Sequence, residues 1–372
     1  MKAEAGNTLL IVGPASFELQ DGRASVLGAP LDSTRHVVTR GKQIPIEIHS
    51  LSSMKIHLGQ DGSIEELSGS TIPLSWREAA STLEELEEGT AVVVGGVDTG
   101  KSTLCTFLCN SLIRQGRRVA LVDADIGQAD LGPPTTMGGG EVTRHVTSLS
   151  GIETSERLFI GLTSPSLVQG KVIHGVKKLV ALHASHNKLV VLNTDGWVTG
   201  KEAISYKVEM LDELRPELTI GIGNGSDTYR ILHSVKGTTL LAGSPDTIKE
   251  RTRVDRKELR ALGYQEYLSG SSLKTFRIDG VKLRSSLSSE LLHVASLKPS
   301  RVVELKDRIL GFLDEDDFLL EIGVLMDIVP SATILKAWSR LACVPCRIEI
   351  GEVKLNREGR EQGARSDSTR FR

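Results

Sequence analysis

The sequence predicts an α/β protein built on a doubly wound, mostly parallel sheet of the P-loop NTPase type, with β-rich domains at both ends. Between about residues 85 and 272, apolar runs rich in β-branched residues alternate with longer helical segments. Buried parallel strands have continuous apolar sequences because helices cover both faces of the sheet. A glycine-rich motif also directly follows the first of these runs and opens the first helical segment.

The central region, residues 85–272, is expected to hold six strands and four helices in alternation. The expected strands are 91–94, 119–122, 158–162, 189–192, 218–222 and 239–242. The expected helices lie near 101–114, 168–185, 201–213 and 246–268. This order is typical of a parallel sheet with crossover helices.

The flanking regions show short apolar stretches separated by turn signals, a pattern typical of small sandwiches or barrels. In the N-terminal β-rich domain, residues 1–84, we expect strands at 8–12, 24–27, 36–39, 44–48 and 55–58. In the C-terminal β-rich domain, residues 273–355, we expect strands at 275–278, 280–283, 301–305, 319–327 and 346–352. Residues 356–372 are polar and arginine-rich, and we expect a disordered tail there.

Composition excludes several functional classes. The 372 residues carry a formal net charge of −2, so any contact with nucleic acid must come from local basic patches. The N-terminus lacks the apolar core of a signal peptide, and the longest apolar runs are too short to span a bilayer. We therefore expect a cytoplasmic protein with no membrane partner.

The four cysteines give no strong indication of a metal site or a redox site. Cys105 and Cys109 lie among apolar residues of an expected helix and are predicted to be buried. Cys343 and Cys346 form an isolated C-x-x-C pair, whereas a structural zinc site needs about four ligands. We expect this pair to pack in the C-terminal core, with a metal or redox role as the alternative.

The motif Gly95-x-x-x-x-Gly100-Lys101-Ser102 has the spacing and context of a phosphate-binding P-loop. Glycines let the backbone curl until successive N–H groups point at phosphate oxygens, and the following helix adds its positive end. Lys101 supplies a charge for the β- and γ-phosphates, and Ser102 can ligate Mg²⁺. The alternative is an ordinary glycine-rich turn.

Two carboxylates follow the next expected strand. Asp123 and Asp125 alternate with Ala124, so they should face the same side of an extended segment beside the P-loop. Two acids at this position suggest that one serves the hydrated Mg²⁺ and the other the attacking nucleophile. A turn-capping role is the alternative, chiefly for Asp123.

With these segments the chain resembles the polynucleotide 5′-hydroxyl kinase family. That family includes archaeal RNA kinases, the kinase subunit of the eukaryotic pre-mRNA cleavage factor and nucleolar pre-rRNA processing kinases. The resemblance is carried by residues 96–103, 123–128, 161–165, 193–198 and 250–260. They match the family's P-loop, its acidic strand end, its Gly-x-Thr-Ser-Pro and Asn-Thr-x-Gly-Trp-Val segments, and its arginine-rich lid. The layout of three domains is also similar.

The resemblance implies a role for each matching residue. Asp125 would activate the 5′-hydroxyl, Trp197 would clasp the RNA end, and lid arginines would reach the transferring phosphate. The candidate site then consists of catalytic Asp125, Lys101, Arg251 and Arg256; nucleotide-binding Gly95, Gly96, Val97, Asp98, Thr99, Gly100, Lys101, Ser102 and Thr103; substrate-binding Trp197, Thr163 and Gln128; and the metal ligands Ser102 and Asp123.

Physical reasoning on the lid and on Trp197 agrees with these roles. Arginines that close over a transferring phosphoryl group offset the charge spread over its oxygens. Arg253, Arg256 and Arg260 share one helical face, and Arg251 lies off that face unless the helix starts after it. A solvated helix face is the alternative for the arginines, and core packing is the alternative for Trp197. An aromatic ring at the sheet edge would stack on a terminal base.

The expected reaction is transfer of the γ-phosphate of ATP or GTP, with Mg²⁺, to the 5′-hydroxyl end of RNA or DNA. Two other functional classes are the alternatives. An ATP-binding scaffold of an RNA-processing complex, without turnover, would not need Lys101, Ser102, Asp125 and the lid arginines together. A regulatory GTPase would need a guanine-reading Asn-Lys-x-Asp segment, which the sequence lacks at its strand ends.

Overall fold

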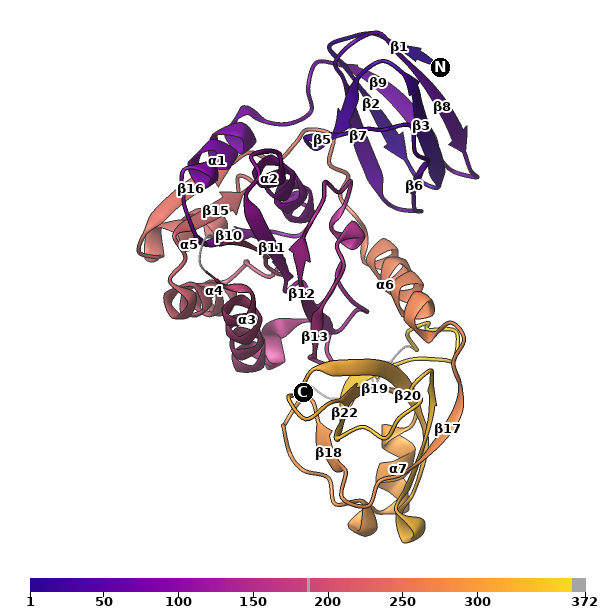
Figure 1. Cartoon of the computed structure of the whole chain (residues 1–372). Coiled ribbons are helices and arrows are strands. Elements are labelled where there is room, and N and C mark those ends of the chain that lie inside the picture. The colour runs from indigo at the N-terminus through magenta and orange to yellow at the C-terminus, as the bar shows by residue number, and fades with distance from the viewer. Residues whose placement is uncertain (186–187, 363–372) are drawn as a thin grey trace, which may run out of the picture. The chain divides into compact units, whose positions relative to one another are not determined.

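A computed structural model describes residues 1–185 and 188–362 of the chain (Figure 1). The chain forms two compact units, each assembled from separate stretches of sequence. The first comprises residues 1–123, 139–153 and 177–251, and the second comprises 124–138, 154–176 and the chain from residue 252 onward. Within the described ranges, every helix is too short or too polar to cross a membrane. The domain boundaries after residues 84, 272 and 355 stay predictions.

The N-terminal strands form two antiparallel sheets, ordered β1-β8-β3-β6 and β5-β4-β7-β2-β9 (Figure 1). Along β7, Ile44, Ile46 and Ile48 are buried and the residues between them are not, so one face of the strand packs into the core. All five expected strand segments are confirmed. The strands are β1 Lys2–Ala3, β2 Asn7–Val12, β3 Ala15–Asp21, β4 Ala24–Val26, β5 Ala29–Pro30, β6 His36–Val38, β7 Gln43–Ile48, β8 Ser52–Leu58 and β9 Ser63–Ser68.

Helix α1, Leu74–Glu84, was not expected in the N-terminal region. It packs against α2, Lys101–Arg114, and the indole Nε1 of Trp76 donates to the carbonyl oxygen of Gly243 at 2.8 Å. Its buried residues Trp76, Ala79, Ala80 and Leu83 recur at helical spacing. That spacing is readable in the sequence and would have predicted the helix.

The P-loop region contains five strands that pair in parallel, in the order β11-β14-β10-β15-β16. Helices α1 and α2 lie on one side of these strands, and α4 and α5 lie on the other (Figure 1). This confirms the doubly wound sheet. The elements are β10 Gly89–Gly95, β11 Arg118–Asp123, β12 Thr136–Val142, β13 Glu156–Phe159, α3 Gln169–His183, β14 Lys188–Asn193, α4 Lys201–Leu214, β15 Leu218–Ile222, α5 Ser226–Ser234 and β16 Thr238–Ala242. Only α5 and β12 were not expected.

Parallel pairing brings the carboxyl ends of three strands together. Asn193, the last residue of β14, is in register with Asp123 of β11 on one side and with Val93 of β10 on the other. β10 continues to Gly95, where the glycine-rich motif begins. The register therefore places Asp123 and Asn193 beside the start of the P-loop, as expected for a ligand site in an open α/β sheet.

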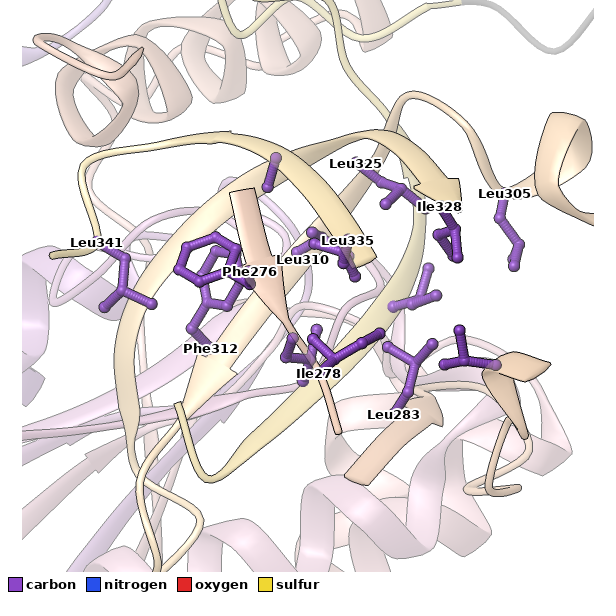
Figure 2. Packing of buried hydrophobic residues seen from close by; sticks show 14 residues of the cluster. Phe276, Ile278, Leu283, Leu305, Leu310, Phe312, Leu325, Ile328, Leu335 and Leu341 are labelled. Carbon is purple, nitrogen blue, oxygen red and sulfur yellow. The ribbon is translucent and has the colours of Figure 1, made fainter. Parts of the chain in front are cut away.

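The C-terminal region is a six-stranded sheet ordered β17-β21-β20-β19-β22-β18. Figure 2 shows its apolar core, in which the rings of Phe276 and Phe312 lie 5.3 Å apart. Only the β18–β22 pair is parallel among the described pairs of this sheet. The elements are α6 Arg253–Leu268, β17 Ser272–Arg277, β18 Lys282–Ser285, α7 Pro299–Leu305, β19 Arg308–Leu313, β20 Leu319–Val329, β21 Ile334–Ser339 and β22 Arg347–Lys354.

Replacing Phe312 by alanine is expected to destabilise this sheet strongly. The side chain is fully buried and lies beside Phe276 in the cluster of Figure 2. Removing a buried phenylalanine typically lowers the free energy of unfolding by about 3–5 kcal/mol. Urea unfolding followed by amide protection in β19 to β22 measures the change. Leu320→Ala, at an exposed position of the same sheet, serves as control and should shift the midpoint little. Equal shifts for both variants would contradict this assignment of the core.

Two expectations for the C-terminal region were wrong. Residues 301–305 form the end of helix α7, not a strand, because Pro299 starts a helix in its first turn. Cys343 and Cys346 are both exposed, so they do not pack in the core. Cys105 and Cys109 are buried, as expected.

The expected polar tail begins with a defined turn. The N–H of Asn356 donates to the carbonyl oxygen of Arg360, and Glu361 forms an ion pair with Arg260 of helix α6. Residues 356–362 are therefore held against α6, which differs from the expected disorder. The rest of the expected tail, residues 363–372, lies outside the described residues.

Candidate active site

The loop between β10 and α2 requires glycine at both ends. Gly100 has φ of +100°, which L side chains rarely adopt, and a Cβ there would lie 2.8 Å from Ile248. A Cβ on Gly95 would lie 2.6 Å from the carbonyl oxygen of Ile222. The conformation of the loop therefore depends on the positive φ of Gly100 at one end and on the close packing of Gly95 at the other.

Lys101 is the first residue of α2 and is largely buried. Its Nζ donates to the carbonyl oxygen of Gly96 at 2.7 Å, and Thr99 Oγ1 donates to the same oxygen at 3.0 Å. The lysine side chain thus folds back over the loop, next to the amino end of α2. A helix N-terminus and an ammonium group both favour an anion at this point.

Asn193 joins the two residues expected to hold Mg²⁺. Its Nδ2 donates to Asp123 Oδ1 at 2.9 Å and to Ser102 Oγ at 3.2 Å. Asp123 and Asn193 are buried, so their positions are set by packing as well as by these bonds. Magnesium prefers such oxygen ligands and needs only one or two from the protein. The donor set therefore fits a magnesium ion beside the P-loop.

Arg251 lies against the P-loop. Its backbone N–H donates to Asp98 Oδ2 at 2.9 Å, its guanidinium forms an ion pair with the same carboxylate at 3.7 Å, and Nη2 donates to the carbonyl oxygen of Gly41 at 3.4 Å. Asp98 itself has φ of +54°. Arg251 is therefore placed by a carboxylate of the P-loop and precedes helix α6, which begins at Arg253.

The segment from Asn193 to Val198 also packs on the P-loop. A Cβ on Gly196 would lie 3.0 Å from both the N and the Cα of Val97, so the two backbones touch. Trp197 follows and is half-buried, and its ring stacks on Tyr206 of α4 with 5.6 Å between centroids and 30° between planes. The ring is thus supported by the core on one side but is not enclosed in it.

In the second unit, Asp125 closes a tight turn. Its Oδ1 accepts hydrogen bonds from the backbone N–H groups of Gly127 at 3.2 Å and Gln128 at 3.1 Å. Strand β11 ends at Asp123, and the N–H of Ile126 already bonds back to Ala124. The turn, and not the expected strand alternation, therefore sets the position of the Asp125 carboxylate.

The other residues expected to bind substrate are connected to this turn. A Cβ on Gly127 would lie 2.9 Å from the carbonyl oxygen of Thr163, so the Thr163 backbone packs on the turn. Gln128 Nε2 donates to the carbonyl oxygen of Arg256 at 3.3 Å. Asp125, Gln128, Thr163 and the lid helix therefore form one connected group within the second unit.

The C-terminal sheet anchors the segment that carries Thr163. The N–H of Glu352 donates to the carbonyl oxygen of Gly161 at 2.8 Å, and a Cβ on Gly161 would lie 2.9 Å from Gly351. Lys171 forms an ion pair with Glu349 at 2.6 Å. The C-terminal β region thus helps to fix the position of the segment that carries Thr163.

The lid helix α6 has a capped start and an anchored middle. Thr252 and Asp255 cap each other's backbone N–H groups, and Arg256 follows, partly exposed. Arg260 is committed to the Glu361 carboxylate. Burial is the largest single effect and lowers the pKa of the Arg260 guanidinium, but the hydrogen bonds that Arg260 donates to Glu361 and the attraction of nearby negative charges together raise it above its usual value. Of the three arginines expected on one face, Arg260 therefore anchors the lid.

The P-loop, the Trp197 segment and the lid all fall within a match to a family model. The family is described as mRNA cleavage and polyadenylation factor CLP1 P-loop, and its model matches residues 95–270. This stretch of the chain is therefore similar to the CLP1 P-loop family. The resemblance inferred from the sequence motifs is thereby confirmed.

Curated relatives agree with the CLP1 family match. A polyribonucleotide 5′-hydroxyl-kinase of Pyrococcus horikoshii is 26% identical over 77% of this chain and 91% of its own length. One of Pyrococcus abyssi is 31% identical over 55% of this chain and 57% of its length. A protein CLP1 homolog of Anopheles gambiae is 26% identical over 64% of this chain and 56% of its length. The chain thus spans little more than half the length of the latter two.

Solved structures show the same fold. The structure of a wild-type Clp1p–Pcf11p complex matches 95% of this chain and 97% of the matched chain, with a TM-score of 0.69 and 11% identity. At that identity the likeness establishes the fold alone. It agrees with the P-loop NTPase fold described above.

Sequence reasoning missed two polar residues of the site and one contact. Asn193 connects the expected metal ligands, and Asp195 lies behind Trp197. Asp98 was expected to bind nucleotide, but its contact with Arg251 was not predicted. Asn193 ends a buried parallel strand, and Asp195 follows two residues later; polar residues at such strand ends are a readable signal. The contact between Asp98 and Arg251 joins residues 153 apart in the chain, so only the fold reveals it.

Proposed function

We propose that this chain is a polynucleotide 5′-hydroxyl kinase, transferring the γ-phosphate of ATP or GTP to the 5′-hydroxyl end of RNA or DNA. The observation that carries the proposal is the group Ser102, Asn193 and Asp123 beside the P-loop, within a stretch similar to the CLP1 P-loop family. The names of the archaeal relatives, polyribonucleotide 5′-hydroxyl-kinases, supply the acceptor.

The nucleotide side of the reaction follows from the P-loop. Backbone N–H groups of residues 95–103 and the amino end of α2 would hold the phosphates, and Lys101 would release Gly96 and move onto the β- and γ-phosphates. Ser102 and Asp123 would hold Mg²⁺, with Asn193 keeping both oxygens in place. When bound, the ion offsets negative charge on the phosphates.

On the acceptor side, Asp125 is the proposed general base. Two backbone N–H groups donate to its Oδ1 and hold the carboxylate in place as the group that would accept the proton. The 5′-oxygen forms a bond to the γ-phosphorus as the bond from that phosphorus to the nucleoside diphosphate breaks. The proton of the 5′-hydroxyl passes to Asp125. Trp197 would stack on the terminal base, and Thr163 and Gln128 would line its surroundings.

The two arginines have different proposed roles. Arg251 is tied to Asp98 of the P-loop, so it would follow the nucleotide-binding loop. Arg256 is in the first turns of the lid helix and would add positive charge over the γ-phosphoryl group as it transfers. Both guanidinium groups would offset negative charge on the phosphates.

Incubation with γ-labelled ATP and 5′-hydroxyl oligonucleotides tests the proposal directly. Labelled product on single-stranded RNA, single-stranded DNA or duplex ends supports it, and the relative yields identify the acceptor. ATP binding without label transfer to any of these ends would contradict the kinase and favour an ATP-binding scaffold. Repeating the assay with GTP compares the two donors.

Replacing Trp197 by alanine is expected to weaken oligonucleotide binding by roughly 1–3 kcal/mol, because stacking on an aromatic ring contributes about that much per base. ATP affinity should change little, since the P-loop contacts remain. Fluorescence anisotropy with labelled 5′-hydroxyl RNA measures the first and nucleotide titration the second. If melting temperature falls while the oligonucleotide Kd is unchanged, Trp197 is a core residue and the proposed contact is wrong.

A further inference from the structure

A buried ion pair lies directly behind Trp197. Lys207 of α4 is fully buried, and its Nζ lies 2.7 Å from Oδ2 of Asp195, which is also buried. Removing two charges from water is costly, and a buried pair often stabilises a protein no better than apolar residues of the same volume. The pair is therefore better explained by the geometry that it imposes.

The Asp195 carboxylate ties the surroundings of Trp197 together. Its Oδ2 accepts hydrogen bonds from Lys207 Nζ and, at 2.9 Å, from Tyr206 Oη. Its Oδ1 accepts one from the backbone N–H of Trp197, also at 2.9 Å. The Lys207 ammonium lies 4.9 Å from the centre of the Tyr206 ring, and the Trp197 ring stacks on Tyr206. One carboxylate thus holds both the Trp197 backbone and the ring that supports the indole.

The same segment is pressed against the nucleotide loop. Gly196 lies between Asp195 and Trp197, and a Cβ there would lie 2.8 Å from Cγ2 of Val97 and 3.0 Å from its backbone N and Cα, so Val97 would have to shift. Any change in where this segment sits must therefore move either Trp197 or the P-loop. Pre-positioned groups accelerate reactions because the ordering cost is met before the substrate arrives.

We infer that Tyr206, held by the Asp195–Lys207 pair, is a positioning residue that holds the Trp197 ring in the orientation needed to stack on the terminal nucleotide. Gly196 in turn fixes the position of the Trp197 segment relative to the P-loop. This inference rests on the proposed function. It adds to that function a rigid stacking surface, prepared before substrate binds and connected to the nucleotide site through one glycine.

Three single substitutions, two at Tyr206 and one at Tyr229, test the inference. Tyr206→Leu removes the supporting ring and is expected to raise KM for a 5′-hydroxyl oligonucleotide by about 3- to 10-fold, the range of an aromatic pair. KM for ATP should stay unchanged. Tyr206→Phe keeps the ring and should recover most of the loss. Tyr229→Leu, which removes an exposed tyrosine of α5, should leave both KM values unchanged.

The binding arm separates this inference from the kinase proposal. Anisotropy of a labelled oligonucleotide reports Kd without turnover, so the order wild type, Tyr206→Phe, Tyr206→Leu can be measured even if no label is transferred. If the wild-type protein transfers no label, the proposed function is wrong, but the positioning role of Tyr206 can still be tested by binding. Equal oligonucleotide Kd for Tyr206→Leu and wild type, or an equal rise in both KM values, overturns the positioning role.

Gly196→Ala provides a second test if Tyr206→Leu does not fold. Its Cβ would displace either Val97 or the Trp197 segment, so we expect weaker binding of ATP, of oligonucleotide, or of both. Gly170→Ala is the matched control, because a Cβ there meets nothing within 4 Å. Unchanged affinity for both ligands in Gly196→Ala would overturn the connection between the two sites.

Discussion

Lys101→Ala is expected to reduce turnover by at least ~10²–10³, because a single preorganised positive or hydrogen-bond donating group at a developing charge contributes about this much. In the structure the ammonium lies over the P-loop, bonded to the Gly96 carbonyl, within reach of the loop that would hold the phosphates. Alanine is a good helix former at the start of α2, so the fold should persist. A radiolabel transfer assay at saturating ATP measures the loss.

The control for Lys101 is an exposed lysine outside the motif. Lys282→Ala, at an exposed position of β18, should retain wild-type turnover. Both variants should unfold at nearly the wild-type temperature. A folded Lys101→Ala variant with near-normal turnover would remove the basis for assigning the P-loop a catalytic role.

Asp125→Asn is expected to lower kcat by about 10²–10⁴, the usual contribution of a positioned general base. The amide keeps an oxygen for the N–H groups of Gly127 and Gln128, so the turn should survive while the proton acceptor is lost. Nucleotide affinity should remain close to normal because Ser102 and the loop amides are untouched. Single-turnover transfer and nucleotide titration measure the two quantities.

The Mg²⁺ dependence distinguishes a base from a metal ligand. Asp123→Asn is the comparator and should raise the Mg²⁺ requirement, since Asp123 shares Asn193 with Ser102. Arg256→Ala should lower kcat, by ~10³ if it acts like other arginines on transferring phosphates, and leave the Mg²⁺ requirement alone. If excess Mg²⁺ restores Asp125→Asn, then Asp125 is a ligand and Asp123 becomes the candidate base.

Most of the central fold could be predicted because its signals are local. Continuous apolar runs marked every parallel strand that pairs around β10, and the helix opened by the P-loop begins and ends where expected. Helix α7 was misassigned as a strand because Val302, Val303 and Leu305 resemble one when read without Pro299. Helix α1 was missed because its four buried residues follow a stretch dominated by strands.

The candidate site was predicted in part for the same reason. A P-loop is a contiguous motif whose glycines are required by backbone torsion and packing, so residues 95–103 could be identified from sequence. By contrast, the partners of Arg260 and Arg251 are about a hundred or more residues away along the chain. Spacing on a helix indicated which arginines share a face, but it did not show that Arg260 pairs with Glu361.

The sequence by itself determined the doubly wound P-loop sheet, the phosphate-binding loop and the acidic strand end, because each depends on periodicity or on a contiguous motif. Tertiary structure alone decided how those parts support one another. The amide of Asn193 between Ser102 and Asp123, the Asp98 carboxylate on Arg251, and the buried Asp195–Lys207 pair behind Trp197 all depend on the fold. The physical reason is that buried polar groups must find partners in three dimensions, and sequence spacing does not specify which ones.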